Sequence, residues 1–188
     1  MNKNMKHSGK EYTQRVKYNQ GFTLIEILVV MVIIGVIAVL GIGNFQSSQL
    51  KARDTARKSD LRQITTALEA YYNDYGSYPL DINGEVAGCA GGQACSWGET
   101  FTDDNGTVYM VNLPLESRDT SSYYYSSTDG RSFQLYARFE NTLDQLVPKN
   151  MSDVAQVYSG TDCGALTCNY GVSSSNVNPE TGRSLLTE

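Results

Sequence analysis

Two features near the start of the chain have the chemistry of a cleavage and pairing site. Gly21-Phe22 stands directly before a long apolar segment, and Glu26 is the only ionisable residue between Phe22 and Lys51. A cut after Gly21 would create a free amine at Phe22, four positions before Glu26. Residues i and i+4 share one face of a helix, so the amine and the carboxylate could pair within one chain or between chains.

Pairing between chains would give Glu26 a role in assembly. A carboxylate in a membrane segment costs on the order of 3 kcal/mol by insertion scales, so it is expected to have a partner. A subunit entering a helical array would satisfy Glu26 by placing it against the Phe22 amine of the next chain, and this contact would set the axial register. The alternative is that the Glu26 side chain extends to the membrane interface by itself.

The residues from Gly21 to Glu26, with the sequence GFTLIE, carry a resemblance to a known family. Together with the basic stretch before them and the apolar run after them, they resemble the class III signal of type IV pilins and type II secretion pseudopilins. The resemblance covers roughly residues 15–45. It implies that a membrane prepilin peptidase cuts after Gly21 and methylates the new amine of Phe22, and that Glu26 becomes the fifth residue.

The apolar segment 22–45 is the element that must position these residues. As a helix it would extend about 36 Å, at about 1.5 Å per residue, which exceeds a hydrocarbon core of about 30 Å. The segment is therefore predicted to be a transmembrane helix that becomes the filament core. The alternatives are a buried helix of a soluble protein and an ordinary secretory signal cleaved near Gly41 and Gly43, which would leave Glu26 unexplained.

Residues 1–21 have the composition of a leader. Their basic residues outnumber the single acid, Glu11, although the whole chain has a formal net charge of −5. Basic residues are also frequent just after the apolar segment, so the orientation in the membrane follows from the resemblance alone. The only histidine, His7, lies in this leader. Its removal would exclude His-based triads and most His-containing metal sites from the mature chain.

A second helical stretch is predicted at residues 46–75. It contains no proline, and apolar residues at three-and-four spacing predict one buried stripe, formed by Leu61, Ile64, Leu68, Tyr71 or Tyr72, and Tyr75. The charged stretch 51–62 predicts a solvated face, because Asp54 precedes Arg57 and Lys58 by the three and four positions that suit helical ion pairs. Gly76 followed by Pro79 predicts where the helix ends.

Residues 76–188 are predicted to form a glycine-rich head with short strands. The stretch Ser122–Phe139 predicts a β-hairpin, because Asp129-Gly130 suits a type I′ turn. Alternating residues predict one core-facing side, made by Phe133, Leu135, Ala137 and Phe139. Thr107–Val111 predicts a third strand. The predicted fold class is α+β and pilin-like, with the C-terminal half of a long helix packed on a small antiparallel sheet.

The head contains all the cysteines of the chain, which are Cys89, Cys95, Cys163 and Cys168. In an exported domain an even number predicts disulfides, and four cysteines allow three connectivities. Local pairing, Cys89 with Cys95 and Cys163 with Cys168, closes the shortest loops and is favoured. The spacings are wider than those of common zinc knuckles, so no metal site is predicted.

Calcium needs separate consideration, because the resemblance includes pseudopilins that bind it in the head. The oxygen-rich stretch 103–106 does not fit the EF-hand pattern, which would require an oxygen ligand at Phe101 and a Glu at Asn112. A turn explains 103–106 better. A calcium site built from distant loops, including Asp162, is the alternative that the sequence leaves.

Catalysis finds no support in the residues, and the chain is predicted not to be an enzyme. The resemblance implies a structural subunit of a type IV pilus-like filament, stored in the bacterial cytoplasmic membrane and polymerised into a cell-surface pilus. The alternatives are the major pseudopilin of a type II secretion or DNA-uptake machine, in a periplasmic pseudopilus, and a single-pass anchored binding module. The implied partners are further copies of the chain, prepilin peptidase, an inner-membrane platform protein, an assembly ATPase and minor pilins.

Overall fold

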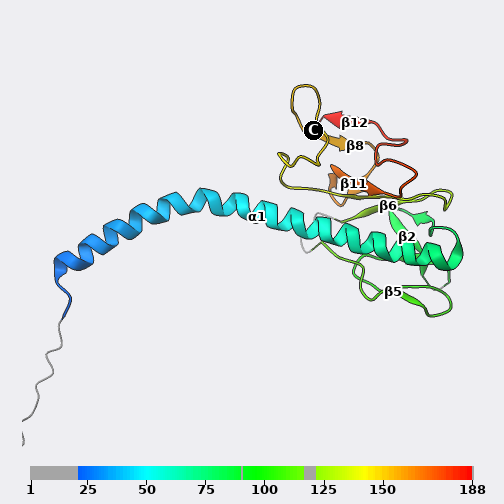
Figure 1. Ribbon diagram of the computed structural model, residues 1–188, viewed down its shortest axis with the longest axis horizontal. Helices are drawn as coiled ribbons and strands as arrows, with labels where there is room; N and C mark the ends of the chain where they lie inside the picture. The colour runs from blue at the N-terminus through cyan, green and yellow to red at the C-terminus, as the bar shows by residue number, and fades with distance from the viewer. Residues whose placement is uncertain (1–20, 90, 117–121, 188) are drawn as a thin grey trace, which may run out of the picture. The chain divides into compact units, whose positions relative to one another are not determined.

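The computed structural model describes residues 21–89, 91–116 and 122–187, without the side chains of residues 39–44. The chain divides after Asn44 into two compact units. The helix α1, Leu24–Tyr75, contributes residues to both units (Figure 1). The predicted leader, apart from Gly21, lies outside the described residues.

The first unit contains the predicted membrane segment. Among the described residues, no helix combines the length and the apolarity that are needed to cross a bilayer. The segment predicted at 22–45 includes residues 39–44, whose side chains lie outside the description.

The second unit combines the C-terminal part of α1 with small antiparallel sheets, which confirms the predicted α+β fold (Figure 1). One sheet has the order β1-β2-β3, with β1 at Asp81–Ile82, β2 at Glu85–Cys89 and β3 at Gln93–Cys95. A second has the order β11-β7-β6, with β6 at Tyr124–Ser126, β7 at Gln134–Ala137 and β11 at Tyr170–Ser173.

Three two-stranded sheets complete the described head. They pair β4 (Phe101–Thr102) with β5 (Val108–Met110), β8 (Gln156–Tyr158) with β12 (Leu185–Thr187), and β9 (Asp162–Cys163) with β10 (Leu166–Thr167). The third strand predicted at Thr107–Val111 therefore exists as β5, but it pairs with β4 rather than with the predicted hairpin. The hairpin is extended instead by β11, which the sequence did not predict.

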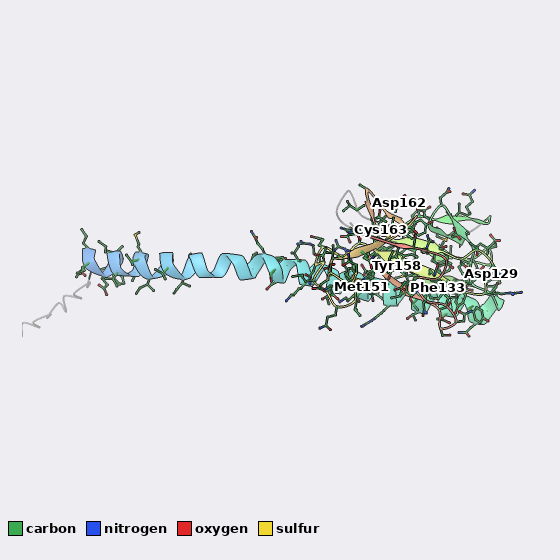
Figure 2. All side chains as sticks on the ribbon, turned by 90° about the horizontal axis from the view of Figure 1, so that it is seen from above. Asp129, Phe133, Met151, Tyr158, Asp162 and Cys163 are labelled. Atoms are coloured by element: carbon green, nitrogen blue, oxygen red, sulfur yellow. A yellow bond between two sulfur atoms is a disulfide. The ribbon has the colours of Figure 1, made fainter. Side chains whose placement is uncertain are left out.

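The predicted hairpin is confirmed, but its turn differs from the prediction. β6 and β7 pair in antiparallel register, with Tyr125 opposite Leu135. The connection from 127 to 133 is longer than a two-residue type I′ turn, and in the described part of this loop only Gly130 has a positive φ, of 69°. The loop is held by the Ser127 hydroxyl, which donates to the Ser132 carbonyl at 2.8 Å. Figure 2 shows Asp129 at the periphery of the head.

β7 is buried on both faces, whereas the sequence predicted one core-facing side. The predicted residues Phe133, Leu135, Ala137 and Phe139 are all buried in the main core. Tyr136, on the opposite face of β7, is also fully buried and belongs to a second cluster with Tyr158 and the Cys163–Cys168 pair. The reason is that each face of β7 packs in a cluster of its own, the main core on one face and the cluster of Tyr136 and Tyr158 on the other.

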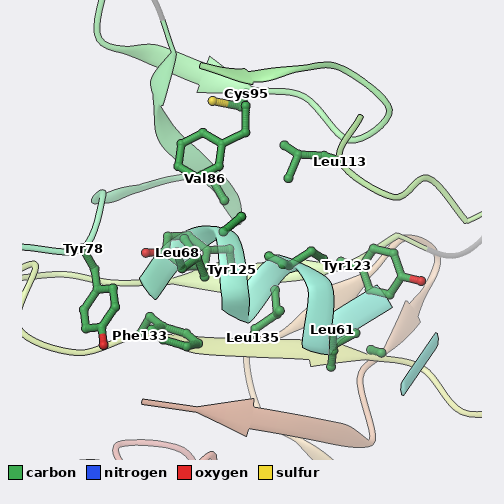
Figure 3. Close-up of a cluster of buried hydrophobic side chains, with 14 of the residues drawn as sticks. Leu61, Leu68, Tyr78, Val86, Cys95, Leu113, Tyr123, Tyr125, Phe133 and Leu135 are labelled. Atoms are coloured by element: carbon green, nitrogen blue, oxygen red, sulfur yellow. The ribbon is translucent and has the colours of Figure 1, made fainter. Parts of the chain in front are cut away.

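The main core lies between α1 and the sheets. Leu61, Ile64 and Leu68 are completely buried, which confirms the predicted stripe, and Figure 3 shows Leu61 and Leu68 among side chains from β2, β6 and β7. At the end of the stripe, Tyr71 packs against the cluster, whereas Tyr75 is partly exposed. The helix ends at Tyr75, and Gly76 follows with φ 69° and donates its N–H to the Tyr72 carbonyl, as is usual for a C-terminal glycine cap.

The charged face predicted to be solvated is partly buried. Asp54 and Arg57 have only 1% and 3% of their surface exposed. The Arg57 guanidinium donates to Asp54 at 2.6 Å, to Glu116 at 2.5 Å and to Glu140 at 2.9 Å. Asp54 also accepts the backbone N–H of Glu140 with the same oxygen that contacts Arg57, and the backbone N–H of Asn141 with its other oxygen. The prediction was wrong because these acidic partners come from loops far along the chain.

The same contacts explain the electrostatics of the cluster. Hydrogen bonds from Arg53 and then from Arg57 outweigh the effect of burial and lower the pKa of Glu140 to about 2. Burial opposes the charge on Arg57, but hydrogen bonds to Glu116 and Glu140 raise its pKa overall. Glu140 and Arg57 are therefore ionised near neutral pH, and their ion pair helps to tie the helix to the head.

Candidate functional site

The apolar side chains of the first unit are exposed over the described part of their helix. From Phe22 to Ile37, the large apolar residues expose between 45% (Ile27) and 84% (Leu24) of their surface. Monomeric soluble proteins rarely expose apolar patches of this extent, and such patches mark contacts with protein or lipid. The segment therefore has the character of an assembly or membrane surface.

Glu26, the one acid in this apolar surface, caps the helix. Its carboxylate accepts the N–H of Thr23 at 3.4 Å, and its own N–H donates to the Thr23 hydroxyl at 3.3 Å. This reciprocal arrangement is a capping box, which satisfies backbone donors that the first helical turn leaves free. The role of Thr23 was not predicted, although its spacing from Glu26, T-x-x-E, is that of a capping box and could have indicated this contact.

Gly21 and Phe22 lie just before the helix and are exposed, with 78% of the Phe22 surface accessible. Nothing within 4 Å would contact a side chain at Gly21. An enzyme could therefore reach the bond between them. Before cleavage the Phe22 nitrogen is part of a peptide bond, so pairing of its amine with Glu26 stays a prediction.

The cysteines form two short loops in the head. The structure joins Cys89 to Cys95 and Cys163 to Cys168, which is the local pairing that the sequence favoured. Cys163 and Cys168 are completely buried, whereas Cys89 is half-buried. Neither pair lies in the apolar surface, so both stabilise the head rather than the exposed helix.

The acidic stretch 103–106 forms a turn. Asp103 accepts the N–H groups of Asn105 and Thr107 with one oxygen and the hydroxyl of Tyr75 with the other, at 2.7 Å. The Tyr75 hydrogen bond, helped by the backbone donors, lowers the pKa of Asp103 to about 2. In the parts of the chain that the structure describes, no three His, Cys, Asp or Glu residues are grouped to hold a metal, and Asp162 is no exception.

Two comparisons with known sequences agree with this site. Residues 16–42 match the family model described as the prokaryotic N-terminal methylation motif. The chain is 30% identical over 125 residues to type II secretion system core protein G of Pseudomonas aeruginosa, which covers 64% of this chain and 83% of that protein.

Other relatives match over a shorter part. Core protein G of Escherichia coli is 42% identical over 65 residues, and type IV major pilin protein PilA of Myxococcus xanthus is 35% identical over 60 residues. These matches cover 35% and 32% of this chain, and the chain spans 45% and 27% of those two relatives. No solved structure is significantly similar. The methylation motif, the exposed apolar helix with its single acid and the long match to core protein G together show that the chain belongs to the type IV pilin and type II secretion pseudopilin family.

Proposed function

We propose that this chain is a structural subunit of a type IV pilus-like filament, held in the bacterial cytoplasmic membrane by residues 22–45 until the leader is removed. The observation that carries the proposal is the apolar surface of the first unit, exposed from Phe22 to Ile37 and interrupted by one carboxylate. Copies of the chain would bury this surface against one another in a helical array that does not close.

Glu26 has two roles in this proposal. Before assembly it caps its own helix through Thr23. After cleavage and methylation at Phe22, its carboxylate would pair with the amine of the neighbouring subunit and set the axial register. Removal of the charge then affects assembly more than the fold of the head, because Glu26 has no described contact in the head.

The test compares Glu26→Ala and Glu26→Gln with Glu180→Ala, a matched change at an exposed acid in the head. We expect both Glu26 variants to be cleaved and to accumulate in the membrane but to form few or deformed filaments, as measured by electron microscopy and by shearing of surface fibres. Glu180→Ala should assemble normally. Normal filaments from both Glu26 variants would refute the assembly role and would favour a membrane-anchored binding module.

A second candidate is the short pseudopilus of a type II secretion machine. It is favoured by the match to core protein G of Pseudomonas aeruginosa, because that match extends over most of the relative, whereas the match to the Myxococcus pilin covers about a quarter of it. Deletion of the gene separates the two functions. Loss of protein secretion with surface fibres intact would identify the pseudopilus, and loss of fibres with secretion intact would identify the pilus.

The proposed partners are prepilin peptidase, an inner-membrane platform protein, an assembly ATPase and minor pilins, and no catalytic role is proposed for the chain itself. Processing can be tested by N-terminal sequencing and intact mass of the membrane-purified protein. We expect a chain that begins at Phe22 and is heavier by one methyl group. A chain that begins at Met1 or near Asn44 would remove the free amine and, with it, the proposed pairing of Glu26.

A further inference from the structure

The head contains a polar hollow that the filament proposal does not use. Its volume is about 320 Å³, within the size range of small-molecule sites. One wall is the connection between β6 and β7, and the other is the stretch 177–183. Among the described residues that line it, Arg183 is the only charged one.

Hydrogen bonds hold both walls of the hollow in place. The Gln134 side-chain amide donates to the carbonyls of Asn178, at 2.8 Å, and Thr181, at 2.9 Å. The Tyr136 hydroxyl donates to the Pro179 carbonyl at 2.6 Å. On the opposite wall, Ser127 bridges its own loop. A ligand entering this hollow would have little protein to order, which lowers the cost of binding.

Arg183 is fixed with part of its guanidinium free. Its Nε donates to the Tyr136 hydroxyl at 3.0 Å, and its Nη1 donates to the Ser159 and Gly160 carbonyls. The guanidinium also lies 5.0 Å from the centre of the Tyr136 ring. Its Nη2 has no hydrogen-bond partner among the described residues. A fixed guanidinium with free N–H groups is suited to bind a carboxylate or another oxyanion.

The rest of the lining suits hydroxyl groups. Ser126, Thr128 and Ser132 line the hollow, and their hydroxyls have no hydrogen-bond partner in the described chain. Each can donate one hydrogen bond and accept two, as can the hydroxyl of a sugar. Val177 adds an apolar surface for the C–H face of a sugar ring.

We propose that this hollow binds an acidic sugar, with its carboxylate on Arg183 and its ring hydroxyls on Ser126, Thr128 and Ser132. A neutral sugar would leave the cation without a counter-charge, and a simple anion would leave the three hydroxyls unused. The proposal does not depend on the type of filament. In a filament, every subunit would carry one such site.

The first test is isothermal titration calorimetry on the full chain in detergent micelles. The probes are galacturonate, galactose as the neutral sugar, and inorganic phosphate as the anion without a sugar ring. We expect saturable binding of galacturonate and about tenfold weaker binding of the other two, since galactose loses the charge-assisted hydrogen bond to Arg183 and phosphate loses the hydrogen bonds to the lining hydroxyls. Equal binding of galactose would refute the role of Arg183, and equal binding of phosphate would refute recognition of the hydroxyls. The absence of saturable galacturonate binding would refute the site.

The second test uses variants. Thr128→Val combined with Ser132→Ala removes two lining hydroxyls that support no other described group, and it should weaken galacturonate binding about tenfold. Ser152→Ala, at an exposed residue outside the hollow, is the matched control and should bind normally. Arg183→Gln should weaken galacturonate binding by about tenfold or more, with Trp97 fluorescence as a check that the head is folded. Unchanged affinity of the double variant would contradict the proposal even if Arg183→Gln fails to fold.

Discussion

Arg57 shows how much a buried charge depends on its partners. One guanidinium contacts the carboxylates of Asp54, Glu116 and Glu140, at distances from 2.5 to 2.9 Å. A buried ion pair is worth little compared with well-packed apolar side chains, but loss of one partner leaves the others buried and charged. The cluster is therefore more sensitive to the loss of Arg57 than its position in a charged helical stretch would indicate.

We expect Arg57→Ala to lower the free energy of unfolding by about 3–5 kcal/mol, because three carboxylates lose their shared counter-charge. Denaturant unfolding followed by the fluorescence of Trp97, which packs against the core, measures this change. Arg62→Ala is the control, since Arg62 is exposed on the same helix and its loss should change stability by less than about 0.5 kcal/mol. Equal effects of the two changes would show that the cluster contributes nothing.

Glu140 makes the free energy of unfolding of the head depend on pH in the acidic range. Its folded pKa of about 2 lies below its ordinary value of 4.5, so its stabilising contribution is present above about pH 4.5 and is lost as the pH falls toward about 2. Between about pH 5 and about pH 2.5, the wild type should lose about 1–2 kcal/mol more than Glu140→Gln, after allowance for solvent screening. Thermal unfolding at both pH values checks this, and parallel pH profiles would contradict it.

At the scale of elements, the two disulfide-closed loops differ in access. The Cys163–Cys168 pair is completely buried beside Tyr136 and Tyr158, whereas Cys89 is half-buried. A mild phosphine reductant under native conditions should therefore open Cys89–Cys95 first. Alkylation and mass spectrometry of the peptides would show the order. Equal labelling of all four cysteines, or earlier labelling of Cys163 and Cys168, would contradict the expected order.

Local signals in the sequence predicted the elements whose determinants are close together in the chain. The stripe of Leu61, Ile64 and Leu68, and the helix end at Gly76, follow from spacing and from a glycine cap. The hairpin was predicted correctly from alternation, but the predicted type I′ turn was wrong, because that turn needs two residues with positive φ and only Gly130 has one in the described loop.

Contacts between distant segments could not be predicted in the same way. β11 pairs with β7 across more than thirty residues, and nothing local marks that partner. Gly171 in β11 lies so close to β7 that an added Cβ would be 2.8 Å from the Tyr136 ring, which gives a physical reason for the glycine in the strand. At the candidate site, the motif from Gly21 to Glu26 was predicted from sequence, whereas the capping role of Thr23 was overlooked.

At the scale of the whole molecule, the division after Asn44 predicts independent folding of the second unit. The buried apolar residues of the described chain, from Leu61 to Cys168, all lie within it. We therefore expect a fragment of residues 45–188, exported so that its disulfides form, to unfold in one cooperative transition. Circular dichroism and Trp97 fluorescence measure this transition, and the full chain in detergent is the reference. A fragment without a cooperative transition would show that the head needs the first unit.

The charge cluster around Arg57 also fixes the position of the helix along its own axis. Moving the helix by one residue along its own axis shifts each side chain by about 1.5 Å and turns it by about 100°. Asp54 would then lose the two backbone N–H groups of 140 and 141, and Arg57 would lose both glutamates at once. A stripe of apolar side chains tolerates such a displacement more easily than ionised groups do. A helix displaced by one residue within the folded head would thus be strongly disfavoured.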